Sequence, residues 1–87
     1  MHDRKPPVSE CEVSVTDVTG RRRTLKVRAY SLYSAVFAYN AEVVSGSARD
    51  YPRPTRETEL EVRAPDGRIL RTTFGKAADW ANRPKRR

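Results

Sequence analysis

Two segments of this chain alternate apolar and polar residues on both sides of a short glycine-containing turn, and this pattern constrains the fold most. In residues 10–16 every second side chain is apolar, and the alternation resumes in residues 24–29 after a turn at Gly20. A period of two residues is typical of a strand with one buried face. The segment therefore predicts a β-hairpin.

The two apolar sets also decide the length of that turn. A two-residue loop would place them on opposite faces of the hairpin, whereas a three-residue loop places them together. We therefore expect a type I turn followed by Gly20 in the left-handed region, which forms a G1 bulge and pairs Asp17 with Arg21. The resulting register pairs Val13 with Leu25, Cys11 with Val27, Glu12 with Lys26 and Glu10 with Arg28.

The same logic applies to residues 59–64 and 70–74, which flank the turn Pro65-Asp66-Gly67. Gly67 takes the left-handed bulge position in this second hairpin. The expected register pairs Val62 with Leu70, Leu60 with Thr72 and Glu61 with Arg71, and Phe74 closes the buried face. The two hairpins are too short and generic to be a repeat, so we interpret them as one turn device used twice.

Residues 31–46 between the hairpins predict a helix with Ser31 as its N-cap and Gly46 as its stop. One stripe of this helix is expected to cover the sheet, and it consists of Leu32, Ala35, Val36, Tyr39 and Val43. A second stripe about 100° away needs another cover, either within the chain or from another molecule. It consists of Tyr33, Phe37, Ala41 and Val44.

The rest of the chain divides around this core. Residues 47–56 contain Pro52 and Pro54, which exclude a helix and predict an extended, stiffened loop that is either functional or mobile. A short helix is expected over residues 76–82, with Trp80 at the edge of the core. Ligand stacking is the alternative role for Trp80.

The length of 87 residues fits a single domain. We expect a flexible N-terminal arm over residues 1–9, one α+β domain over residues 10–82 and a basic tail over residues 83–87. A chain this short buries a modest core, so self-association stays open.

The charge balance favours an anionic partner. There are 18 Lys and Arg against 11 Asp and Glu, which gives a net charge of +7. The cross-strand pairs predicted above neutralise much of the sheet, so the remaining cations are the candidates for sequence-independent, salt-sensitive contacts with nucleic acid. They include Arg21, Arg22, Arg23, Arg53, Lys85, Arg86 and Arg87.

No residue pattern points to catalysis, a metal or a cofactor. His2 is the only histidine and lies in the N-terminal arm, and Cys11 is the only cysteine and lies on the inward face of a strand. No glycine-rich phosphate cradle is present. No apolar run approaches the length of a membrane span, and no signal-peptide pattern occurs, so we expect a cytoplasmic protein without membrane contact.

The order strand-strand-helix-strand-strand over residues 10–74 resembles the β-grasp or ubiquitin-like arrangement. Ubiquitin-like modifiers end in a diglycine, whereas this chain ends Arg83-Pro84-Lys85-Arg86-Arg87, so the resemblance does not extend to conjugation. Residues 19–35 also look like small uncharacterised bacterial proteins in which a hairpin precedes a Ser-Leu-Tyr helix start. That resemblance implies a fold and a bacterial origin only.

The sequence thus predicts a small non-enzymatic binding module with a ββαββ(α) fold. The expected partner is a protein or a second copy of the chain, bound through Tyr33, Phe37 and Val44. Binding of nucleic acid through the basic turn, loop and tail is the alternative. A cleft that gathers Asp17, Asp66 or Asp79 around a metal would instead indicate an enzyme.

Overall fold

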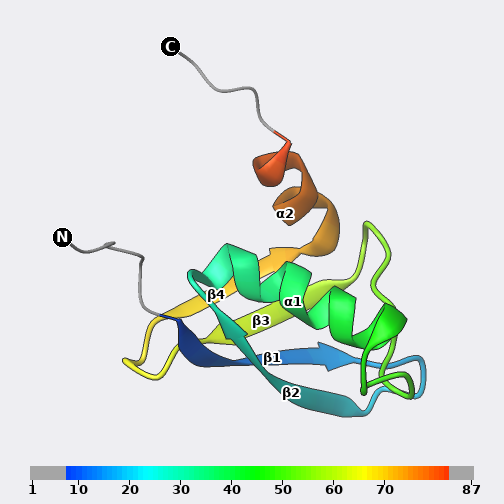
Figure 1. Cartoon of the computed structure of the whole chain (residues 1–87). Helices are drawn as coiled ribbons and strands as arrows, with labels where there is room; N and C mark the ends of the chain where they lie inside the picture. The colour runs from blue at the N-terminus through cyan, green and yellow to red at the C-terminus, as the bar shows by residue number, and fades with distance from the viewer. Residues whose placement is uncertain (1–7, 83–87) are drawn as a thin grey trace, which may run out of the picture.

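The computed structural model describes residues 8–82, and it has the predicted α+β architecture (Figure 1). The four strands form one antiparallel sheet in the order β2-β1-β3-β4, and α1 crosses one face of it. The predicted tail and most of the predicted arm, residues 83–87 and 1–7, lie outside the described residues. The elements are β1 (Ser9–Thr16), β2 (Arg22–Ala29), α1 (Leu32–Ser45), β3 (Glu59–Arg63), β4 (Ile69–Thr73) and α2 (Phe74–Ala81).

Both hairpins have the register and turn that the alternation predicts. Asp17 and Arg21 flank a three-residue loop, and the Asp17 N–H donates to the Arg21 carbonyl at 2.9 Å. Gly20 and Gly67 have φ values of 86° and 97°, a region that side chains with a Cβ rarely adopt. The predicted pairs Val13–Leu25, Cys11–Val27, Val62–Leu70 and Leu60–Thr72 all occur.

The two hairpins join through β1 and β3, which pair in antiparallel fashion. Val13 faces Val62 across this central pair, and neither side chain is exposed. The resemblance to a β-grasp arrangement is limited to the order of the elements along the chain. All three strand pairings of this sheet are antiparallel.

Helix α1 begins and ends where the capping residues predict. The Ser31 side chain accepts the Ser34 N–H, and the Ser34 side chain accepts the Ser31 N–H in return, which completes a capping box. At the other end, a Cβ on Gly46 would lie 2.9 Å from the backbone Cα of Glu42, so a side chain at this position would force the end of the helix to shift. The first stripe faces the sheet as expected, with Ala35, Val36, Tyr39 and Val43 buried.

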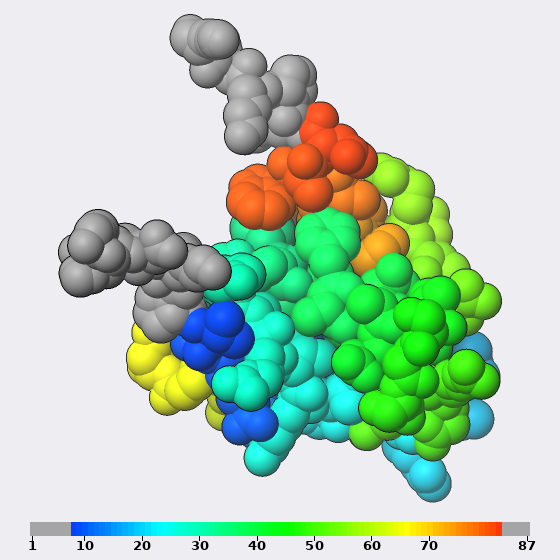
Figure 2. All heavy atoms as spheres, in the orientation of Figure 1, coloured from blue at the N-terminus to red at the C-terminus, as the bar shows by residue number. Residues whose placement is uncertain are grey.

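Helix α2 starts two residues earlier than the sequence suggests, and this corrects the placement of Phe74 in the last strand. Thr73 ends β4 and at once caps α2, because its hydroxyl accepts the Lys76 N–H at 3.2 Å. Phe74 is therefore the first residue of the helix. Figure 2 shows α2, in orange, seated on the first turns of α1.

The connection between α1 and β3 is held at both ends by the folded chain. Tyr39 donates its hydroxyl to the Pro52 carbonyl at 2.8 Å, and the Tyr51 hydroxyl donates to the Thr24 carbonyl of β2 at 3.2 Å. Near β3, the Gly75 N–H of α2 donates to the Arg56 carbonyl. Burial raises the pKa of Tyr39 to about 12, so its hydroxyl keeps the proton that it donates.

Candidate binding surfaces

The second stripe of α1 is covered within the chain where α2 meets it. Tyr33 stacks on Trp80 with ring centroids 4.7 Å apart, and Phe37 packs against Phe74 at 6.0 Å. Both α1 side chains are half-buried as a result. The predicted partner surface is corrected accordingly, because Tyr33 and Phe37 face α2 and leave no continuous exposed stripe.

Val44 is the remaining member of the predicted partner surface. It is 46% exposed and lies in the last turn of α1, eleven residues after Tyr33. A helix rises about 1.5 Å per residue, which separates the two positions by roughly 16 Å along the axis. Val44 and Tyr33 therefore lie at different ends of α1.

Two partly exposed aromatic side chains are associated with the N-terminal end of α1. Trp80 is 47% exposed, and Tyr30, which precedes the Ser31 cap, is 60% exposed. Since one face of the Trp80 ring is covered by Tyr33, its exposed part consists of the other face and the ring edges. Trp80 thus holds α2 against α1 through this stack and is also partly exposed to solvent. We call Tyr30, Tyr33 and Trp80 the aromatic end.

The predicted cluster of arginines in the first turn is mostly engaged by the fold. Arg23 lies over the Tyr51 ring, 4.5 Å from its centroid, and pairs with Asp50 at 3.6 Å. Arg22 pairs with Glu61 at 3.2 Å. Arg21 and Arg53 are exposed. Of the predicted nucleic-acid contacts, Lys85, Arg86 and Arg87 lie outside the described residues.

The excess charge is unevenly distributed along the sequence. Residues 8–82 contain twelve Lys and Arg and ten Asp and Glu, a net charge of +2. Residues 1–7 and 83–87 contain six Lys and Arg and one Asp, a net charge of +5. Most of the net charge therefore belongs to the two end segments of the sequence.

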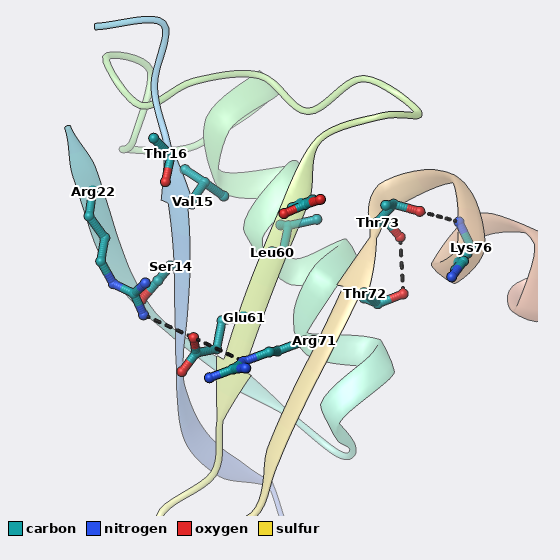
Figure 3. A pocket seen from close by; sticks show the side chains of 11 residues that line it. Ser14, Val15, Thr16, Arg22, Leu60, Glu61, Arg71, Thr72, Thr73 and Lys76 are labelled. Atoms are coloured by element: carbon teal, nitrogen blue, oxygen red, sulfur yellow. Dashed lines mark hydrogen bonds and ion pairs between the residues drawn. The ribbon is translucent and has the colours of Figure 1, made fainter. Parts of the chain in front are cut away.

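The sheet face opposite α1 carries a cluster that the sequence revealed only in part. Glu61 forms an ion pair with Arg71 of the neighbouring strand at 3.6 Å, in the predicted register pair, and a second ion pair with Arg63 at 3.7 Å. Arg22 reaches the same carboxylate from β2, across the intervening β1 (Figure 3). We call Glu61, Arg22, Arg63 and Arg71 the arginine cluster.

The small side chain of Ser14 allows Arg22 to span that distance. Ser14 lies in β1 between Thr24 of β2 and Glu61 of β3, and its hydroxyl shares a hydrogen bond of 2.8 Å with Thr24. The sequence signal for this contact is thus the small residue Ser14 beside Glu61, which becomes informative once the strand order is known.

The arginines keep Glu61 ionised. The hydrogen bond from the Arg22 side chain, followed by the charges of Arg22, Arg71 and Arg63, holds the pKa of Glu61 below its ordinary value. The carboxylate is 17% exposed, whereas the side chains of Arg22 and Arg71 are 58% and 79% exposed. The cluster therefore has a partly covered anion at its centre and accessible cations around it.

The groups considered for catalysis are dispersed in the described part of the chain. Within residues 8–82, no three His, Cys, Asp or Glu side chains come together in a way that could hold a metal ion. Asp17 and Asp66 cap their own turns by accepting the Arg21 and Arg68 N–H groups, and Asp79 pairs with Arg56. Cys11 is buried, and burial raises the pKa of its thiol.

Comparisons with family models, with curated proteins and with solved structures found no match to this chain. Neither helix described here combines the length and the apolar character needed to cross a membrane.

Proposed function

We propose that this chain is a non-enzymatic binding module that captures an acidic protein partner through its aromatic end. The observation that carries the proposal is the half-exposed Trp80, stacked on Tyr33 and accompanied by the exposed Tyr30. Tryptophan and tyrosine dominate the energetics of protein interfaces because they bury a large, rigid area at a low cost in conformational entropy. The proposal keeps the predicted function and moves the contact from the α1 stripe to its N-terminal end.

The charge of the chain favours a partner that differs from the chain itself. A second copy would bring another net charge of +7 against the first, which disfavours association. An acidic partner gains from the same charge, because Arg83, Lys85 and Arg86 follow Trp80 closely in the sequence. The partner expected here therefore has apolar anchor residues surrounded by carboxylates.

Binding of a defined probe tests this proposal. The probe is a fluorescently labelled helical peptide with leucines on one face and glutamates on the other, and its anisotropy is followed during titration with the chain. We expect saturable binding that Trp80→Ala weakens about tenfold or more, as is typical of an interface anchor. Val44→Ala is the matched control, since Val44 is 46% exposed at the opposite end of α1.

The stack of Trp80 on Tyr33 also holds α2 in place, so a second variant separates binding from folding. Tyr30 is 60% exposed and precedes the helix, and Tyr30→Ala leaves the stack intact. We expect it to weaken peptide binding without changing the circular dichroism spectrum. Equal weakening by Val44→Ala, or no saturable binding by the wild-type chain, would overturn the proposal.

Nucleic-acid binding is the second candidate function, and the concentration of charge in residues 1–7 and 83–87 favours it. Single-stranded nucleic acids combine phosphate contacts with stacking of bases on aromatic rings. A labelled oligothymidine is therefore titrated alongside the peptide. Tighter, steeply salt-dependent binding of this probe, with quenching of the single tryptophan, would move the function from protein to nucleic acid.

A further inference from the structure

The sheet face opposite α1, which we call the open face, contains a groove that the proposed function does not use. Figure 3 shows its central part, where Arg22 from β2 and Arg71 from β4 point toward Glu61 of β3. The groove has a volume of about 550 Å³, which falls in the usual range for small-molecule sites. Its walls carry hydroxyls as well as charges, from Ser14, Thr16, Thr73 and Lys76.

We propose that this groove binds a phosphate group, held between Arg22 and Arg71. Both guanidiniums line the groove, and Glu61 draws them toward each other from β2 and β4, the two edge strands of the sheet. Planar guanidinium groups offer paired N–H donors that match the oxygens of a phosphate. Glu61 thus acts as a positioning residue, because it holds Arg22 and Arg71 close together although their charges repel each other.

The charge of the groove fits this class of ligand. Three cations line it, Arg22, Arg71 and Lys76, against two carboxylates, Glu59 and Glu61, which leaves one positive charge uncompensated. The guanidiniums of Arg22 and Arg71 also carry far more N–H donors than the Glu61 carboxylate accepts. A phosphate monoester has a charge of about −1.5 to −2 near neutral pH, so the positive balance of the groove attracts it.

The hydroxyls and the remaining acid define where the phosphate sits. The Thr73 hydroxyl accepts the Lys76 N–H at the α2 end of the groove. Glu59 lies opposite Thr73 and also lines the groove, so its charge offsets that of Lys76 at the α2 end. The most favourable position for the anion is therefore the end that Arg22 and Arg71 share.

Inorganic phosphate and phosphoserine are the probes, and acetate is the comparison anion. Amide shifts of the isotopically labelled chain are followed by NMR at constant ionic strength, which is maintained with chloride. We expect saturable shifts at Ser14, Glu61 and Arg71 with both phosphate probes and none with acetate. Tighter binding of phosphoserine than of inorganic phosphate would identify an organic phosphate as the natural ligand class, and equal binding would identify the free anion.

Variants that each remove one positive charge test whether the phosphate binds in the groove. Because Arg22 and Arg71 are solvent-exposed, each contact is modest, and Arg22→Gln and Arg71→Gln are each expected to weaken binding about threefold. Arg63→Gln is the matched control, since Arg63 contacts the same carboxylate but does not line the groove. Equal weakening by all three variants, saturable binding of acetate, or no saturable shift with phosphate would each overturn the site.

Discussion

The two faces of the sheet divide the properties of this chain between them. On the face under α1, Val13 and Val62 are completely buried, and the apolar set is filled by residues of the chain itself. On the opposite face, Glu61 is surrounded by arginines that remain largely exposed. The difference teaches that the apolar face specifies the fold, whereas the charged face is free to carry groups that the fold does not need.

The physical reason is the difference in energy between the two kinds of contact. Burial of an aliphatic side chain contributes about 1.5 to 3 kcal/mol, whereas exposed ion pairs contribute between zero and about 1 kcal/mol. The arginine cluster can therefore change without loss of the fold. Neighbouring residues of β3, Leu60 and Glu61, point to the two faces and allow a direct comparison.

The largest expected effect is that of Leu60→Ala. Leu60 is 2% exposed and packs in the core on the α1 side of β3. Removal of its side-chain methyl groups leaves a cavity, and we expect the free energy of unfolding to fall by about 3 kcal/mol. Denaturation of the purified chain by urea, followed by circular dichroism, gives this value.

The companion variant Arg71→Gln keeps the aliphatic stem and removes the charge on the other face. Its effect on the urea midpoint is expected to be a small fraction of the Leu60→Ala effect. If Arg71→Gln destabilised the chain as strongly as Leu60→Ala, the division of roles between the two faces would be wrong.

A smaller effect is expected from Tyr39→Phe, which tests a polar group on the apolar side. The Tyr39 ring is fully buried, and its hydroxyl donates to the Pro52 carbonyl. Loss of this hydrogen bond costs about 1 kcal/mol and releases the loop between α1 and β3. Unfolding by urea measures the first effect, and faster hydrogen exchange of the Tyr51 amide, which donates to Ala48, measures the second.

Tyr30→Phe is the control for this prediction. Tyr30 is 60% exposed, so water replaces any contact that its hydroxyl makes. No change in stability is expected. A loss equal to that of Tyr39→Phe would show that the buried hydroxyl has no particular role in holding the loop.

The local parts of the fold followed from the sequence, because each depends on a few neighbouring residues. The three-residue turns follow from strand alternation and a glycine, as the positive φ of Gly20 and Gly67 confirms. The capping role of Ser31 follows in the same way. The early start of α2 was missed although Thr73 is a good capping residue, because apolar alternation extended the expected strand to Phe74.

The candidate sites were less predictable, because they join elements that are distant in the sequence. The contact of Arg22 with Glu61 requires β1 and β3 to be neighbours, and the pair Glu61–Arg71 alone does not show this. Likewise, several segments of the chain could have packed on the second stripe of α1. The stack of Tyr33 on Trp80 identifies α2 as the cover of its N-terminal part.

The smallest expected effect concerns the pH dependence of stability, and it measures the contribution of Glu61 on the open face separately from that of the core. The hydrogen bond from Arg22 and the surrounding charges lower the pKa of Glu61 in the folded chain, so the unfolded chain binds this proton more readily. The stability that the ionised Glu61 contributes is therefore complete above its ordinary pKa of 4.5 and is lost as the pH falls through the lower folded value.

Asp17 and Asp66 have lowered pKa values as well, so the quantity to measure is the difference in unfolding free energy between wild type and Glu61→Gln. We expect this difference to be constant from neutral pH to about pH 5.5, to shrink on further acidification, and to be smaller in high salt. A difference that grew as the pH fell would mean that the arginines do not stabilise the carboxylate.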